Sequence, residues 1–149
     1  MLMSIFNGLA INTSGLALER LKLDTISTNI ANVNTTRTAE GGPYKRKSVE
    51  FSENLKNAQE TDSTGTQLKG TPQSYGVKVT GIQTDNTEKT SYDPSNPDAD
   101  QNGYVQTSNV NMADEMVDMI QAMRTYEANT SAAEMNKTML KKALEISKD

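Results

Sequence analysis

Apolar residues recur at helical spacing at both ends of this chain, and this pattern constrains its fold more than any other feature. In the first 34 residues, ten positions follow at alternating intervals of three and four, and eight of them are apolar, which is typical of a coiled-coil seam. The ten positions are Leu2, Ile5, Leu9, Asn12, Leu16, Glu19, Leu23, Ile26, Ile30 and Val33. Because Phe6, Ile11, Leu18 and Leu21 lie outside this seam, the apolar stripe is wider than one partner helix needs.

The end of the chain carries two further stripes, the second offset by two residues from the first. The first consists of Met112, Met116, Met119, Met123 and Tyr126, and the second of Ala128, Ala132, Met135, Met139 and Ile146. Asn111 is a suitable N-cap residue, acidic residues follow it, and lysines gather toward the C-terminus, which is the order that the helix dipole favours. The pattern predicts a second long helix.

The segment between the two predicted helices is polar and contains all four prolines. Residues 58–74 are low in complexity and are predicted to be flexible. Short alternating runs predict a small antiparallel sheet, and clusters of Gly, Pro, Asn and Asp predict turns. The runs are 44–51, 75–79 and 104–105, and the turns are 41–43 and 93–98.

We therefore predict an α+β fold whose two terminal helices pack as a coiled coil. Residues 1–36 form the first helix, 37–108 a small β-rich and partly flexible middle segment, and 109–149 the second helix. Only 34% of the 149 residues are hydrophobic, which argues against a large monomeric core. The wide stripes predict a subunit whose helices become ordered when copies or relatives pack side by side.

The residue types that are missing exclude most enzyme classes. The chain has no His, Cys or Trp, which removes His- and Cys-based nucleophiles, zinc, haem and Fe–S ligation, and disulfides. We expect no enzymatic activity, no cofactor and no metal. With 15 basic and 19 acidic residues the net charge is −4, which argues against nucleic acid as a partner. We also expect neither membrane insertion nor a cleaved Sec signal, since no long apolar run and no basic leader region occur.

Residues 98–103 fit the first half of a calcium-binding loop, with Asp98, Asp100, Asn102 and Gly103 at the required positions. Position twelve would be Asn109, where a bidentate Glu is needed, and a type I or Asx turn explains the same residues. A calcium-responsive adaptor that uses this loop is the alternative function that the sequence offers.

Three acidic residues, Asp114, Glu115 and Asp118, fall in the first turns of the predicted second helix. They could serve acid–base chemistry or bind Mg²⁺, but we favour a simple interaction with the helix dipole, since no neighbouring group in the sequence would desolvate them.

The basic run 45–47 is short. We interpret it as a solvated strand edge or as a patch that pairs with an acidic neighbouring subunit.

The run 29–35 is unusually rich in Asn for a helix, because Asn side chains compete for backbone hydrogen bonds. One explanation is a frayed helix end with Asn34 in a left-handed cap. We favour the other, in which the amides bond backbone groups of the adjoining turn or of a neighbouring subunit.

Three groups of motifs carry a family resemblance. Those at the N-terminus are Gly15-Leu16, Arg20-Leu21, Ser27, 29–38 and 41–46; those in the middle are 76–82, 92–94, 97–100 and 103–105; those at the end are 109–111, 115–120 and 124–129. Over nearly the whole chain they resemble the bacterial flagellar rod and hook proteins. The chain departs from that pattern in its polar 58–74 segment and at Ser108, where Pro is usual.

The resemblance implies a structural protein of the proximal rod of the flagellar basal body, which crosses the periplasm. In this family the terminal helices form a coiled coil that lines the export channel, and the rod transmits torque. Export would use the flagellar type III apparatus without a cleaved signal. The implied partners are further copies of the chain and the rod proteins FlgB, FlgF, FlgG and FliE.

Carried onto this sequence, the resemblance implies an inter-subunit surface on both helices. It comprises Leu9, Leu16, Leu23, Ile26, Asn29, Ile30, Asn32 and Asn34 in the first helix and Met112, Met116, Met119, Met123, Arg124, Tyr126, Glu127 and Asn129 in the second. The asparagines would fix helix position through amide hydrogen bonds, and Arg124 and Glu127 would pair within or between subunits.

Overall fold

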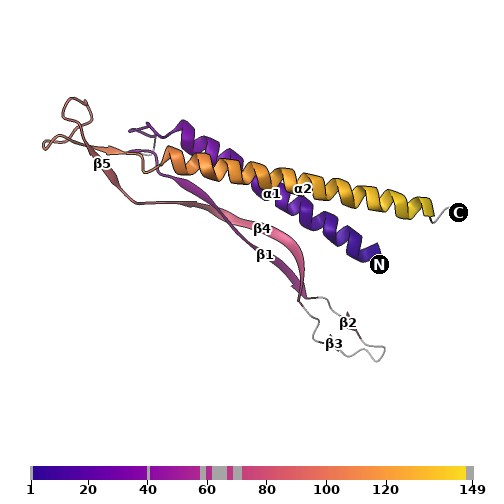
Figure 1. The fold of residues 1–149 in the computed structure, drawn as a ribbon. Coiled ribbons are helices and arrows are strands. Elements are labelled where there is room, and N and C mark those ends of the chain that lie inside the picture. Colours follow the sequence, from indigo (N-terminus) through magenta and orange to yellow (C-terminus); the bar gives the residue numbers. More distant parts are fainter. Residues whose placement is uncertain (1, 40, 58–59, 62–66, 69–71, 147–149) are drawn as a thin grey trace. The chain divides into compact units, whose positions relative to one another are not determined.

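The protein is described here by a computed structural model that covers residues 2–39, 41–57, 60–61, 67–68 and 72–146. Two long helices, α1 (Leu2–Ala31) and α2 (Met112–Ile146), stand at the two ends of the sequence, and strands lie between them (Figure 1). The predicted α+β class and both long helices are therefore confirmed.

The strands of the described residues form three separate two-stranded ribbons. The pairs are β1 (Lys47–Asn57) with β4 (Pro72–Thr84), β2 (Glu60–Thr61) with β3 (Gln67–Leu68), and β5 (Lys89–Tyr92) with β6 (Tyr104–Thr107). In the antiparallel β5–β6 pair, Lys89 stands opposite Thr107 and Tyr92 opposite Tyr104. The prediction of one small sheet is wrong in this respect, because alternation along a strand does not reveal which strand it pairs with.

The predicted flexible segment 58–74 lies largely outside the described residues. The described parts of it, 60–61, 67–68 and 72–74, belong to strands β2, β3 and β4. Flexibility of the remainder stays a prediction.

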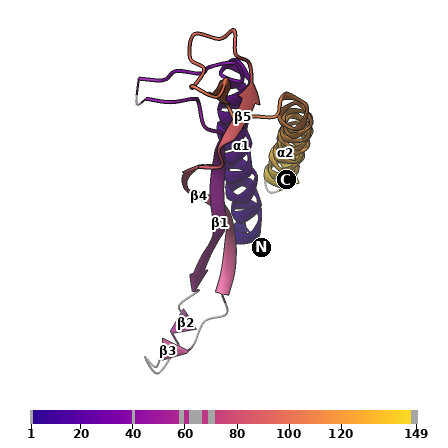
Figure 2. The same cartoon turned by 90° about the vertical axis from the view of Figure 1, so that its left-hand side faces the viewer.

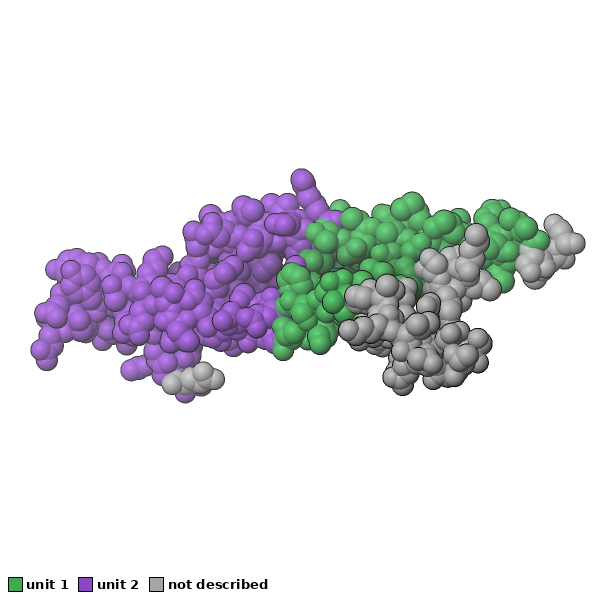
Figure 3. All heavy atoms as spheres, turned by 90° about the horizontal axis from the view of Figure 1, so that it is seen from below, with its two compact units in different colours: residues 1–19, 51–80, 125–149 green, residues 20–50, 81–124 purple. Residues whose placement is uncertain are grey.

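The chain divides into two compact units, and each contains part of α1 and part of α2 (Figure 3). Unit 1 comprises residues 1–19, 51–80 and 125–149, and unit 2 comprises residues 20–50 and 81–124. The division of the sequence into 1–36, 37–108 and 109–149 stays a prediction.

Within unit 1, the two helices approach closely at glycines of α1. A Cβ atom placed on Gly15 would lie 2.8 Å from Asn129 Nδ2, and one placed on Gly8 would lie 3.4 Å from Asn136 Nδ2. Asn129 and Asn136 are seven residues apart, as are Gly8 and Gly15, so the contacts repeat at the spacing of one heptad. A side chain at Gly15 would require the Asn129 amide to shift, so the contact favours a small residue there.

Strand β4 runs beside the first part of α1 in unit 1 (Figure 2). The backbone N–H of Val77 donates to Ser14 Oγ at 3.1 Å, and Asn7 Nδ2 donates to the Ser74 carbonyl at 3.3 Å. Gly76 has a φ of 98°, and a Cβ atom on it would overlap Ser14 Oγ. The strand can therefore meet the helix only with glycine at this position.

Unit 2 has a small apolar core and contains the start of α2. Its buried hydrophobic residues among those described are Ile26, Tyr44, Val105, Val110 and Ala122. Helix α2 begins as predicted: Asn111 Oδ1 accepts from the Ala113 N–H at 3.1 Å. Before it, the hydroxyl of buried Ser108 accepts from the Val110 N–H at 3.3 Å, so the serine supports the turn that leads into the helix.

The predicted chain reversal at 41–43 is also confirmed. Gly41 and Gly42 have φ values of 89° and 76°, which glycine adopts without strain. The Thr38 N–H donates to the Gly42 carbonyl at 2.9 Å, and the Tyr44 N–H donates to the Thr35 carbonyl at 3.0 Å. The reversal thereby returns the chain from the end of α1 toward β1.

The predicted turn at 93–98 is present as well. The Ser95 N–H donates to Asp93 Oδ1 at 3.2 Å, and the Asn96 N–H donates to the Asp93 carbonyl at 3.3 Å.

Replacement of Gly76 by alanine should destabilise unit 1. The added methyl group would meet Ser14 and force a φ of 98° on a residue with a side chain, at a cost of about 1–3 kcal/mol. Hydrogen–deuterium exchange of the β4 amides should become faster.

Gly81→Ala is the matched control in the same strand, because nothing lies within 4 Å of a Cβ atom there. Equal exchange rates in the two variants would contradict the close approach of β4 to α1.

Candidate functional site

The residues of the calcium-loop motif form a turn. Asp100 Oδ1 accepts from the backbone N–H groups of Asn102 and Tyr104 at 2.8 and 2.9 Å, and Asp98 Oδ2 accepts from the Thr36 hydroxyl at 3.3 Å. This is the Asx-turn explanation of the motif. Within the described part of the chain, no three Asp or Glu side chains are grouped so that they could hold a metal ion. The calcium-responsive adaptor therefore has no support.

No helix among the described residues is both long and apolar enough to span a membrane.

The most deeply buried polar side chains of unit 2 meet in one cluster, which we call the Asn29–Glu115 cluster (Asn29, Tyr44, Arg46, Lys47 and Glu115). Asn29 is 1% exposed and Glu115 is 0% exposed. Asn29 Nδ2 donates to Glu115 Oε2 at 3.0 Å and to the Lys47 carbonyl at 2.8 Å. Asn29 Oδ1 accepts from the Tyr44 hydroxyl at 2.9 Å and from the Lys47 N–H at 3.0 Å. Both donors and both acceptor positions of this amide are thus in use.

The buried carboxylate of Glu115 is compensated by Arg46. Arg46 Nε lies 2.5 Å from Glu115 Oε1, and its Nη2 lies 3.2 Å from Asp118 Oδ2. The hydrogen bond to Glu115 is the main cause that raises the pKa of Arg46, and the charges of Glu115 and Asp118 act in the same direction. A buried carboxylate without such a partner would be strongly destabilising, so Arg46 is a requirement for the burial of Glu115.

Tyr44 links the same cluster to the loop before β1. Its ring is buried, and burial is the main cause that raises the pKa of its hydroxyl, with the negative charge of Glu115 as a second cause. The hydroxyl therefore stays protonated and donates to Asn29.

Asn109 fixes the backbone of the loop from a third direction. Its Oδ1 accepts from the Arg46 N–H at 2.7 Å, and its Nδ2 donates to the Asp85 carbonyl at 3.1 Å. The Asp85 N–H in turn donates to the Arg46 carbonyl at 2.8 Å. The guanidinium of Arg46 is thereby presented to Glu115 by a backbone that is held on both sides.

Two interpretations of charged residues are wrong. Glu115 is not merely a solvated partner of the helix dipole, because it is fully buried and paired. Arg46, in the basic run 45–47, is not simply a solvated residue, because its partner is an acid of the same chain 69 residues away. Sequence spacing carries no signal for a pair so distant.

The asparagines of the run 29–35 differ in their partners. Asn29 bonds the backbone of Lys47, the first residue of β1, and not the turn that adjoins α1. Asn32, just after the end of α1, donates to the Thr28 carbonyl at 2.9 Å and accepts from the Thr35 hydroxyl at 3.2 Å. Asn34 is exposed, and since no described residue other than glycine has a positive φ, the left-handed cap at Asn34 is wrong. Asn129 is half-buried beside Gly15.

The buried face of α1 is broader than the predicted seam. Glu19 and Ile26 of that seam are buried, but Leu18, Thr25 and Asn29, each one position earlier than a seam residue, are buried too. The seam residues that were assigned to an interface, Leu9, Leu16, Leu23 and Ile30, are half-buried.

The apolar stripe predicted for α2 is mostly exposed. Met119 is half-buried, while Met112, Met116, Met123 and Tyr126 are exposed, as are Arg124 and Glu127. No ion pair among the described residues includes Arg124 or Glu127. The buried residues of α2 are instead Glu115 and Ala122. Contact of the predicted surface with other subunits stays a prediction.

Four apolar residues in the part of α2 that belongs to unit 2 form one exposed strip, which we call the methionine stripe (Met112, Met116, Ile120 and Met123). They are 41%, 49%, 54% and 48% exposed. Each residue of an α-helix is rotated by about 100° from the one before it, so the four residues fall within a sector of about 80° around the helix axis. The centre of this sector lies about 110° from the direction of the buried residues Glu115 and Ala122. The stripe therefore flanks the packed face and lies on one side of the helix.

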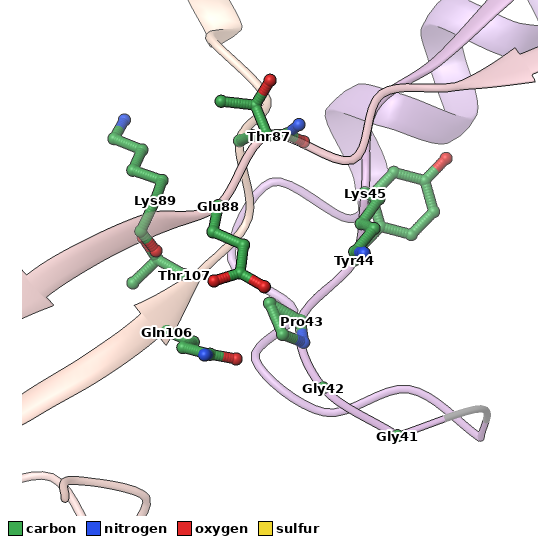
Figure 4. A pocket seen from close by; sticks show the side chains of 11 residues that line it. Gly41, Gly42, Pro43, Tyr44, Lys45, Thr87, Glu88, Lys89, Gln106 and Thr107 are labelled. Atoms are coloured by element: carbon green, nitrogen blue, oxygen red, sulfur yellow. The ribbon is translucent and has the colours of Figure 1, made fainter.

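A small cavity of about 140 Å³ lies between the reversal at 41–43 and the β5–β6 ribbon (Figure 4). The carboxylate of Glu88 points toward Pro43, whereas Lys89 points away (Figure 4). Because its charged groups do not converge, we assign no ligand to this cavity.

Glu115→Gln should destabilise unit 2 by about 2 kcal/mol, because it leaves Arg46 without a buried carboxylate while it keeps the size of the side chain. The midpoint of urea unfolding, followed by circular dichroism, should fall. Asp118→Asn is the control, since the Asp118 side chain is 47% exposed and its pair with Arg46 should contribute less than about 1 kcal/mol. Equal effects would contradict the central role of Glu115.

Tyr44→Phe should cost about 1 kcal/mol near neutral pH through the lost hydrogen bond to Asn29. Since folding raises the pKa of Tyr44, its stabilising contribution is complete below the unfolded pKa of about 10 and is lost as pH rises through the folded pKa. The difference in unfolding free energy between the two proteins should therefore shrink above about pH 10. A constant difference at all pH values would show that Tyr44 is not held in its neutral form.

Comparison with known proteins identifies the family. Residues 9–37 match the family model "Flagella basal body rod protein", and residues 101–146 match "Flagellar basal body rod FlgEFG protein C-terminal". The chain is 40% identical to the flagellar basal-body rod protein FlgC of Borreliella burgdorferi, with 97% of this chain and 98% of that protein covered. It is 40% identical to FlgC of Bacillus subtilis, with 98% and 100% covered, and 34% identical to FlgC of Salmonella typhimurium, with 97% and 98% covered. The chain therefore belongs to the FlgC family of flagellar basal-body rod proteins.

Proposed function

We propose that this structural rod subunit joins its neighbours through the methionine stripe of α2 and the half-buried apolar flank of α1. The observation that carries the proposal is the methionine stripe itself, four large apolar side chains exposed along one side of a helix. A contiguous apolar strip of this kind is characteristic of a protein–protein contact. Methionine is flexible and polarisable, so it can adapt to neighbours that are not identical.

The balance between buried and exposed apolar residues supports the same function. Among the described residues, six hydrophobic side chains are buried, whereas seventeen large ones are exposed. So small a core leaves much of the apolar surface in water, and contacts with other subunits would remove it.

We further propose that α1 and α2 pair as an antiparallel coiled coil. Support comes from contacts at heptad spacing: Gly8 with Asn136 and Gly15 with Asn129 in unit 1, and Asn29 with Glu115 in unit 2. Coiled coils repeat every seven residues because that spacing keeps one seam facing the partner.

The proposed place of the subunit is the proximal rod in the periplasm, reached through the flagellar type III export apparatus without a cleaved signal. Its partners would be further copies of itself and the rod proteins FlgB, FlgF, FlgG and FliE, with the terminal helices around the export channel. The curated relatives are named as basal-body rod proteins, which supports this place. The role is mechanical and non-enzymatic: closely packed long helices share a torsional load, and no chemical step is required.

The methionine stripe can be tested with the double variant Met116→Ser/Met123→Ser. Each substitution removes an apolar contact of about 1.5–3 kcal/mol from every subunit interface, while exposed positions contribute little to the fold of the single chain. We expect unchanged helicity of the purified protein but loss of the variant from isolated basal bodies and loss of swimming in cells that carry only this copy.

Met116→Leu/Met123→Leu is the matched control, because it keeps the stripe apolar and should assemble. Normal assembly of the serine variant would rule out the stripe as an essential contact.

A further inference from the structure

We propose that Asn29 and Glu115 are positioning residues that set the register between α1 and α2. This inference concerns the helix pair within one chain and does not depend on the role of the chain in the rod. It rests on the buried hydrogen bond between the two side chains and on the residue types that stand at the same spacing along both helices.

The observed contacts share one register. In unit 1, the residue numbers of Gly8 and Asn136 add to 144, and so do those of Gly15 and Asn129. In unit 2, the numbers of Asn29 and Glu115 also add to 144. By the same rule Lys22 corresponds to Ala122, a buried residue of α2.

Most of these pairs of opposite residues, which we call layers, cannot select the register by themselves. A slip of one helix by seven residues, about 10 Å of axial movement, keeps the same faces together. In the register whose numbers add to 137, Gly15 would correspond to Ala122, so two small residues would still meet. Lys22 would correspond to Glu115, which offers an attractive charge pair. The small-residue layers and simple electrostatics therefore leave a slipped register open.

The Asn29–Glu115 layer removes that freedom. Asn29 uses all of its hydrogen-bonding capacity in the observed register, and Glu115 uses one oxygen for Asn29 and the other for Arg46. After a slip, the Asn29 Nδ2 group and the Glu115 carboxylate would lose each other at sites that are 1% and 0% exposed. Buried polar groups that lose their partners are costly, which is how a single buried Asn fixes register in other coiled coils.

Cysteine cross-linking can read the register directly, because the chain has no cysteine of its own. Thr25→Cys is suitable on α1, since the Thr25 hydroxyl bonds only within its own helix, to the Leu21 carbonyl. It is combined in turn with one of three cysteines on α2. With Met119→Cys the two residue numbers add to 144, the observed register. With Met112→Cys they add to 137 and with Tyr126→Cys to 151, the two registers that are slipped by seven residues. We expect the 25–119 disulfide to form at least about tenfold more readily than the other two under mild oxidation.

The three cysteine pairs are then placed in Asn29→Leu and, separately, in Glu115→Leu. In each background the slipped pairs should gain about tenfold relative to the 25–119 pair, while circular dichroism shows that the helices persist. Asn32→Leu is the matched control: the same change three residues later, just after the end of α1, where the bonds of the amide go to Thr28 and Thr35, should leave the ratio unaltered.

Each other outcome would overturn the proposal. An unchanged ratio in either variant with intact helices would show that the pair does not choose the register. Equal yields of the three disulfides in the otherwise unsubstituted chain would show that no register is chosen. Loss of helicity in both variants would show that the pair supports the helices in general and does not select between registers.

Discussion

The fold of unit 2 depends on one costly feature, a fully buried carboxylate on Glu115. Burial of an ionised group is tolerated only when charge and hydrogen bonds compensate it, and here both oxygens are bonded, one by Arg46 and one by Asn29. These partners come from the segment before β1 and from the end of α1, and Tyr44 and the backbone of Lys47 hold Asn29 in turn. Unit 2 is therefore cooperative: no part of this arrangement is satisfied unless the others are in place.

Sequence periodicity and local chemistry predicted the elements of the fold well. The caps and turns are local, so Asn111 at the start of α2 and the glycines at 41 and 42 could be interpreted without knowledge of distant contacts. The pairing of β1 with β4 and of β5 with β6 could not, because the alternation along a polar strand carries little information about its partner. The ion pair between Arg46 and Glu115 escaped for the same reason, since 69 residues separate its members.

The choice of the buried face was the least predictable part. A search for apolar stripes assumes that the residues in closest contact are hydrophobic. In this chain the contacts between the helices involve Gly8, Gly15 and the amides of Asn29, Asn129 and Asn136, none of which contributes to such a stripe. The stripe that the sequence does show on α2 is largely in water. Contact of these α2 residues with a neighbouring subunit stays a prediction.

This arrangement separates the interactions within a chain from those proposed between chains. Glycines and the hydrogen bond between Asn29 and Glu115 give the contacts of α1 with α2 a defined geometry, and such groups contribute specificity more than apolar stabilisation. The methionine stripe, which the fold of the single chain leaves exposed, would be buried only when a neighbour is present. If the apolar residues occupied the inner seam instead, the chain would be more stable alone and would have less to gain from assembly. If the proposed torsional load passes through this subunit, the opposite distribution is an advantage, because the strongest apolar contacts then join the subunit to its neighbours.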